Sequence, residues 1–112
     1  MDPMPELMPT AYRGEIWIVD LGMAAKPRPA VILSVEPLNH ERALVTYVPR
    51  TTHLRGTRFE VSHAGRGFDP GGFDAQGLGS VPAVKLVRRL GVIDGATLTQ
   101  VEMAVKAWLG LG

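Results

Sequence analysis

The chain has 112 residues, 46% of them hydrophobic, which is enough for one domain with a single hydrophobic core. It contains no cysteine, which excludes disulfides and thiolate metal sites and favours a cytoplasmic location. No apolar run approaches the length of a membrane span, and the formal net charge of +1 does not by itself indicate a nucleic-acid partner.

The N-terminal residues 1–11 predict a flexible tail. They contain three prolines and two acidic residues, and they lack the basic and apolar regions of a signal peptide. We expect residues 12–112 to form the single domain.

Four short strands are predicted in the first half of the chain, because β-branched and aromatic residues gather there between turn residues. They cover residues 14–20, 30–35, 43–48 and 57–61. We expect Pro49 to end the third strand, since proline has no backbone N–H for the sheet. In the fourth strand charged and apolar residues alternate, which is typical of a strand with one solvent-exposed face.

The stretch before the second strand is a rigid cationic turn, Lys26-Pro27-Arg28-Pro29. The two prolines restrict the backbone on both sides of Arg28 and hold it extended at the mouth of the strand. Its planar guanidinium matches a phosphate or a carboxylate. The alternative is an ordinary surface turn in which the arginine pairs with a neighbouring acid.

Residues 64–79 contain six glycines and Pro70, and we expect a flexible loop there. Gly65-Arg66-Gly67 resembles part of a phosphate-binding loop. However, the full phosphate-loop pattern is absent and no helix follows directly. Arg66 remains available for a ligand contact.

The end of the chain predicts one more strand and one helix. Residues 80–88 form the strand, with Pro82 at an edge or a bulge. Thr99 to Glu102 has the form of a capping box, an apolar face follows it, and Gly110 is placed to end the helix. Short antiparallel strands closed by one amphipathic helix predict a mainly β protein, a partly open antiparallel barrel with the helix packed on it.

Two polar features should meet on one rim of this barrel. Arg28 begins the second strand, and Thr51 and Thr52 follow the third. Strands that are neighbours in sequence usually pair antiparallel, so the start of one lies near the end of the next.

These motifs together resemble the MazF/PemK family of toxins from bacterial toxin–antitoxin systems. The resemblance is carried by R-P-A-V-I-L-S at 28–34, V-P-R-T-T at 48–52, the strands at 13–21 and 80–88, and the C-terminal helix. It covers residues 12 to 111. The chain differs from the family pattern in a shorter loop before Arg28, in Lys85 where an acid or amide is common, and in a longer glycine-rich segment.

The resemblance implies an SH3-like barrel, a homodimer, and cleavage of single-stranded RNA without metal or cofactor. It also implies an antitoxin protein as partner. Arg28 and Thr51 match the positions that act on the scissile phosphate. The other residues predicted to contact RNA are nearby cations and one hydroxyl: Lys26, Arg50, Thr52, Arg55, Arg58, Arg66, Lys85 and Arg88.

His53 is a further catalytic candidate, since a histidine titrates near neutral pH and lies two residues beyond Thr51. The alternative is an exposed loop histidine without a role. His40 and His63 lie in other predicted loops, so the three histidines predict no metal site.

Two functions remain open at this point. One is an endoribonuclease toxin that cuts RNA through the neighbouring 2′-OH. The other is a non-catalytic toxin on the same fold, such as one that binds DNA gyrase, since a fold does not determine a function.

Overall fold

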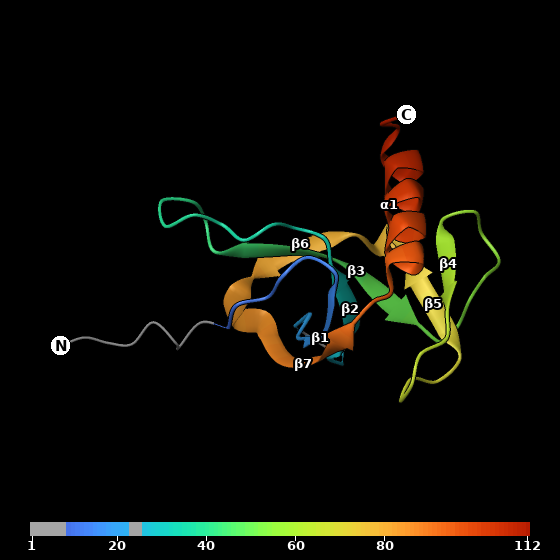
Figure 1. Cartoon of the computed structure of the whole chain (residues 1–112), viewed down its shortest axis with the longest axis horizontal. Helices are drawn as coiled ribbons and strands as arrows, with labels where there is room; N and C mark the ends of the chain where they lie inside the picture. The colour runs from blue at the N-terminus through green and yellow to red at the C-terminus, as the bar shows by residue number, and fades with distance from the viewer. Residues whose placement is uncertain (1–8, 23–25) are drawn as a thin grey trace.

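The computed structural model describes residues 9–22 and 26–112 (Figure 1). It contains seven strands, two short 3-10 turns and one helix. The strands are β1 (Glu15–Val19), β2 (Arg28–Ile32), β3 (Leu44–Thr51), β4 (Glu60–His63), β5 (Gly71–Asp74), β6 (Gly79–Pro82) and β7 (Leu86–Val92). The 3-10 turns are η2 (Ala75–Gly77) and η3 (Ala83–Lys85), and the helix is α1 (Gly95–Leu109).

The strands form an antiparallel sheet in the order β4-β5-β3-β2-β1-β7, with β6 paired to the first half of β3. Within the described residues β4 and β7 do not pair with each other, so the barrel stays open. Helix α1 packs beside β4 and η2 at one end of the sheet (Figure 1). The prediction of a mainly β, partly open antiparallel barrel with a C-terminal helix is confirmed.

The central strands are buried on both faces, which explains their nearly continuous apolar sequences. Ile16, Val31 and Val48 face a cluster that includes Phe73 and Val101 of the helix. Residues of the opposite face, together with Leu86 of β7, form a second buried cluster: Trp17, Val19, Ala30, Ile32, Tyr47 and Leu86. The alternation along each strand therefore supplies two half-cores from one set of strands.

The prediction that Pro49 ends the third strand is wrong. Strand β3 continues through Pro49 to Thr51, and β2 begins at Arg28 rather than at Ala30. The outer edge of β3 changes partner here, because it pairs with β6 as far as Tyr47 and with β5 from Arg50 onward. Pro49 lies between these two pairings, where its missing N–H is tolerated.

Residues 64–79 are not the flexible loop that their glycines predict, since they contain β5, η2 and the start of β6. A methyl group on Gly71 would overlap the backbone oxygen of Thr51, and one on Gly72 would overlap that of Val61. These glycines allow β5 to fit between β3 and β4.

The other differences concern the ends of elements. Strand β4 covers 60–63 rather than 57–61, and the predicted strand 80–88 is interrupted by η3. The helix begins earlier than predicted, because the Asp94 side chain, not that of Thr99, accepts the hydrogen bond of a first-turn N–H. Gly110 ends the helix in the left-handed conformation with φ 70°, as predicted.

The N-terminal boundary also differs in part. Residues 1–8 of the predicted tail lie outside the described residues. Ala11, however, is buried against the second cluster and belongs to the domain. No helix in the described part of the chain is both long and apolar enough to cross a bilayer.

We predict that Gly71→Ala lowers the free energy of unfolding by about 1–3 kcal/mol, because its methyl group would force β3 and β5 apart. Gly91→Ala is the matched control, since Gly91 also lies in a strand but its methyl group would meet no other part of the described chain within 4 Å. Urea unfolding should give a change within about 0.5 kcal/mol for this control. Equal midpoints for the two variants would contradict the packing argument.

Candidate active site

The site lies where β2 begins and β3 ends. Ala30 pairs with Pro49, and continuing this antiparallel register places Arg28 opposite Thr51. A hollow of about 280 Å³ opens here, lined by Lys26, Pro27, Arg28, Pro29, Arg50, Thr51, Thr52 and His53. The prediction that Arg28 and Thr51 share one rim is confirmed.

The hydroxyl of Thr51 has a defined orientation. Its Oγ1 accepts the hydrogen bond of the His53 N–H at 3.0 Å, in a turn that directly follows β3. The oxygen is thereby held, while its own O–H has no acceptor among the described residues and can donate to a ligand. Thr52 Oγ1 lies 3.3 Å from His53 Nδ1, so the exposed imidazole also has a neighbour that restricts it.

Two further hollows adjoin the first. One of about 350 Å³ shares Pro29 and Thr51 with it and adds Phe68, Asp69 and Arg88. The other, of about 190 Å³, shares Arg28, Thr51 and His53 and adds Arg55, Glu60 and Asp74. Because all three contain Thr51, they form one depression along the rim, which we call the rim groove.

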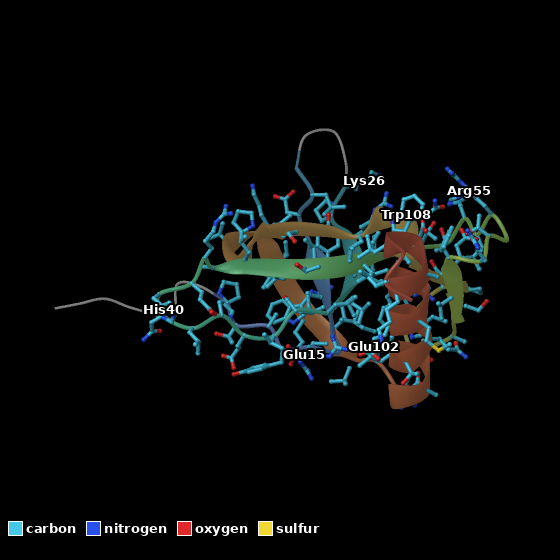
Figure 2. The ribbon with its side chains drawn as sticks, turned by 90° about the horizontal axis from the view of Figure 1, so that it is seen from above. Glu15, Lys26, His40, Arg55, Glu102 and Trp108 are labelled. Carbon is cyan, nitrogen blue, oxygen red and sulfur yellow. The ribbon has the colours of Figure 1, made fainter. Side chains whose placement is uncertain are left out.

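Exposed cations follow the rim groove. Lys26, Arg28, Arg55 and Arg88 are exposed, and Lys26 and Arg55 lie along the same edge of the molecule in Figure 2. Glu60, Asp69 and Asp74 are acids that line the groove as well. The Glu60 carboxylate accepts hydrogen bonds from the backbone N–H groups of Arg55 and Thr57. The hydrogen bonds to Glu60 lower its pKa, and they hold its carboxylate against the loop of Arg55 and Thr57. Cations still outnumber acids along the groove, so an anionic ligand would be attracted to it.

Arg50 lines two of these hollows but, unlike Lys26 and Arg55, it is buried. Its side chain is 5% exposed, and it hydrogen-bonds to His63 and to the backbone oxygen of Asp69. Burial lowers the pKa of Arg50, and the Asp69 carboxylate offsets part of this effect. A period-two reading of β3, extended through Pro49, places Arg50 on the same inward face as Val48, and this signal was available in the sequence.

The sequence places His63 in a loop, whereas in the structure it is the partner of Arg50. It ends β4, is 8% exposed, and accepts the Arg50 Nε–H at Nδ1. Burial first, and then the Arg50 charge, lower the pKa of His63, while Asp94 acts in the opposite direction. The imidazole is therefore neutral with its proton on Nε2.

Three of the cations expected at the site do not line the rim groove. Arg58 stacks on the Phe59 ring at 4.6 Å, Arg66 is exposed on the segment before β5, and Lys85 is half-buried in η3. Residues 23–25 of the loop before Arg28 lie outside the described residues.

In the part of the chain that the structure describes, no three His, Asp or Glu side chains lie close enough together to hold a metal ion. The rim carries the exposed cation Arg28 and the Thr51 hydroxyl in one hollow. That pair is suited to binding an anionic group whose charge increases during a reaction.

The chain is similar to known proteins over nearly its whole length. The family model of PemK-like, MazF-like toxins of type II toxin–antitoxin systems matches residues 12–109. An endoribonuclease in complex with its cognate antitoxin from a mycobacterial species has a TM-score of 0.79 and 25% identity, covering 92% of this chain and 98% of that one.

Two further solved structures have the same fold. Toxin MazF-mt6 from Mycobacterium tuberculosis has a TM-score of 0.75 and 27% identity, with 88% of this chain and 98% of that chain covered. MazF from Deinococcus radiodurans has a TM-score of 0.74 at 23% identity, with 92% and 97% covered.

We predict that acid destabilises the protein through His63. Because its pKa is lowered in the folded state, the unfolded chain binds more protons below about pH 6.5, so stability falls as pH drops from there through the folded pKa. In His63→Asn the loss of urea stability between pH 7.5 and 5 should be smaller than in wild type. His40→Asn, at an exposed histidine, is the control and should keep the wild-type slope. Parallel slopes for all three proteins would refute the assignment.

Proposed function

Since this chain belongs to the family of PemK-like, MazF-like toxins of type II toxin–antitoxin systems, we propose that it is a toxin that cleaves single-stranded RNA, such as mRNA, without a metal ion or cofactor. The observation that carries the proposal is the meeting of Arg28 and Thr51 in one cationic groove. The endoribonuclease activity of a relative with 25% identity and 98% coverage supports it.

Cleavage uses the 2′-OH next to the scissile phosphate. The 2′-oxygen forms a bond to phosphorus as the bond from phosphorus to the 5′-oxygen breaks. The 2′-OH gives up its proton, and the 5′-oxygen gains one. The products are a 2′,3′-cyclic phosphate and a 5′-OH end.

Arg28 and Thr51 stabilise the charge that develops on the phosphate oxygens. The Arg28 guanidinium is exposed at the rim, so a phosphate reaches it without displacing core residues. The Thr51 O–H donates to a phosphate oxygen while the His53 N–H holds its oxygen. An arginine keeps its proton at neutral pH, so Arg28 acts as a fixed cation and not as the proton donor.

His53 is the proposed group for proton transfer. It lines the two parts of the rim groove that contain both Arg28 and Thr51. If His53 takes no part, Arg28 and Thr51 act by positioning and electrostatic stabilisation alone.

The RNA backbone follows the rim groove in this proposal. Lys26, Thr52, Arg55 and Arg88 line it and would contact phosphates on either side of the scissile bond. Arg58, Arg66 and Lys85 lie outside it and would contribute only at longer range.

We further propose that the protein is a homodimer in the cytoplasm and that a cognate antitoxin binds it. A relative was crystallised with its cognate antitoxin. An acidic or amphipathic antitoxin segment would fit the same cations as RNA. The exposed apolar residues Trp108, Leu109 and Leu111 at the end of α1 support an association surface.

We expect Arg28→Ala to reduce cleavage of single-stranded RNA by about 10²–10³-fold, the usual effect of removing one donor from a charge-stabilising site. The fold should survive, because the side chain is exposed. Arg28→Lys should also be impaired, since an ammonium does not replace the planar fork. Arg42→Ala, at an exposed arginine distant in the sequence, is the control.

The assay is run in EDTA on wild type, the two Arg28 variants and the control. RNA left intact by wild type over many sequences would refute the nuclease proposal and favour the non-catalytic alternative. Near wild-type cleavage by Arg28→Ala would refute the site.

For His53→Ala we expect single-turnover cleavage to slow by at least about tenfold if His53 transfers a proton. The variant should also lose one limb of the pH–rate profile between pH 5 and 9. Overlapping profiles for the variant and wild type would show that His53 is a bystander.

A further inference from the structure

Three of the five N–H donors of the Arg50 guanidinium are bound inside the protein. Its Nε donates to His63 Nδ1 at 2.9 Å, and one Nη donates both to the His63 backbone oxygen at 2.9 Å and to the Asp69 backbone oxygen at 2.6 Å. The guanidinium carbon lies 5.0 Å from the centre of the Phe68 ring. No hydrogen bond of Nη1 is found within the described residues, and Arg50 lines two hollows of the rim groove, but the residue is only 5% exposed. Turning the whole guanidinium toward an RNA phosphate would break the three bonds and leave their acceptors unpaired, which is costly.

These contacts join three parts of the chain at the back of the rim groove. Arg50 precedes Thr51 at the end of β3, His63 ends β4, and Phe68 and Asp69 lie in the segment that leads into β5. Phe68 and Asp69 also line the part of the groove that contains Arg88. One side chain therefore ties the strand that carries Thr51 to the wall opposite it.

His63 holds the guanidinium in place. A guanidinium N–H is always a donor, so Nδ1 of His63 must be the acceptor. The imidazole packs against Phe68 and Phe73, with ring centroids 5.3 Å and 4.9 Å away. Gly65 and Gly71 leave room for this cluster, since a methyl group on either would lie about 3 Å from the His63 ring or from Arg50 Nη1, respectively.

We propose that Arg50 is a positioning residue of the rim groove and not an RNA contact, and that His63 is the acceptor that orients it. We call Arg50 with its bonds to His63 and Asp69 the anchor. The anchor keeps Thr51 at a fixed separation from the segment that contains Phe68 and Asp69. The catalytic part of this inference rests on the nuclease function proposed above, whereas the anchoring part does not.

The test compares Arg50→Met, which keeps the apolar stem, with His63→Leu and His63→Asn. Asparagine retains an acceptor near the position of Nδ1, whereas leucine does not. Arg42→Met and His40→Asn are matched controls at exposed positions. If Arg50→Met does not fold, the comparison of His63→Leu with His63→Asn alone tests the proposal.

We expect Arg50→Met and His63→Leu to lower kcat by at least about tenfold with a smaller change in KM, because misplacement of catalytic groups affects the chemical step. His63→Asn should recover most of kcat. The salt dependence of KM is the second readout, since a lost phosphate contact reduces the slope of log KM against log salt by about 0.7 for single strands. An unchanged slope in Arg50→Met supports positioning, and a slope reduced by that amount overturns it.

Amide hydrogen exchange separates this inference from the nuclease proposal. Exchange should speed up at residues 51–53 and 64–70 in Arg50→Met and His63→Leu, and stay near wild type in His63→Asn and in the controls. If wild type fails to cut RNA, the nuclease proposal and the catalytic role of Arg50 both fail, but this pattern still tests the anchor. Unchanged exchange in His63→Leu overturns the anchor whatever the activity.

Discussion

The antiparallel register between β2 and β3 is the constraint on which the rim groove depends. With Ala30 opposite Pro49, the two strands bring Arg28 and Thr51 together two residues further on. A slip by one residue would exchange the two faces of a strand, and both faces are buried here in different clusters. The packing of the two half-cores therefore holds the site, although Arg28 itself is exposed.

Some cations of this chain form contacts within the protein, and others lie along the rim groove. Arg89 pairs with Glu15 at 2.8 Å, Arg13 pairs with Glu102 of α1, and Arg58 lies over the Phe59 ring. Burial alone would raise the pKa of Glu15, but hydrogen bonds from Trp17, Tyr12 and Arg89 outweigh this and lower it, so the ion pair is kept. The cations left along the groove give a local positive field that a net charge of +1 conceals.

The glycine-rich segment, residues 64–79, contacts both β3 and the cluster around Arg50 and His63. Its glycines bring β5 against β3 and leave room beside Arg50 for the His63 cluster. A composition that resembles a mobile loop thus forms one wall of the groove. Its backbone atoms pack too closely for side chains, so the glycines serve close approach here more than flexibility.

The sequence by itself determined the antiparallel barrel, the C-terminal helix with its Gly110 end, and the pairing of Arg28 with Thr51. Each of these follows from local patterns, namely β-branched runs, a helical period and the adjacency of neighbouring strands. The family resemblance on residues 12 to 111 rests on the same motifs, which the matching family model over 12–109 confirms.

Only the tertiary structure determined the positions and contacts of residues whose partners are distant in the sequence. Pro49 stays within a strand because β3 exchanges one partner for another at that point. Residues 71–74 become a strand because β3 and β4 offer edges on both sides. The strand period already places Arg50 on the inward face, but only the fold brings it the acceptors on His63 and Asp69, which are 13 and 19 residues away. Composition cannot separate a cation that faces solvent from one that is satisfied inside, because that difference is set by which acceptors the fold brings within hydrogen-bonding distance.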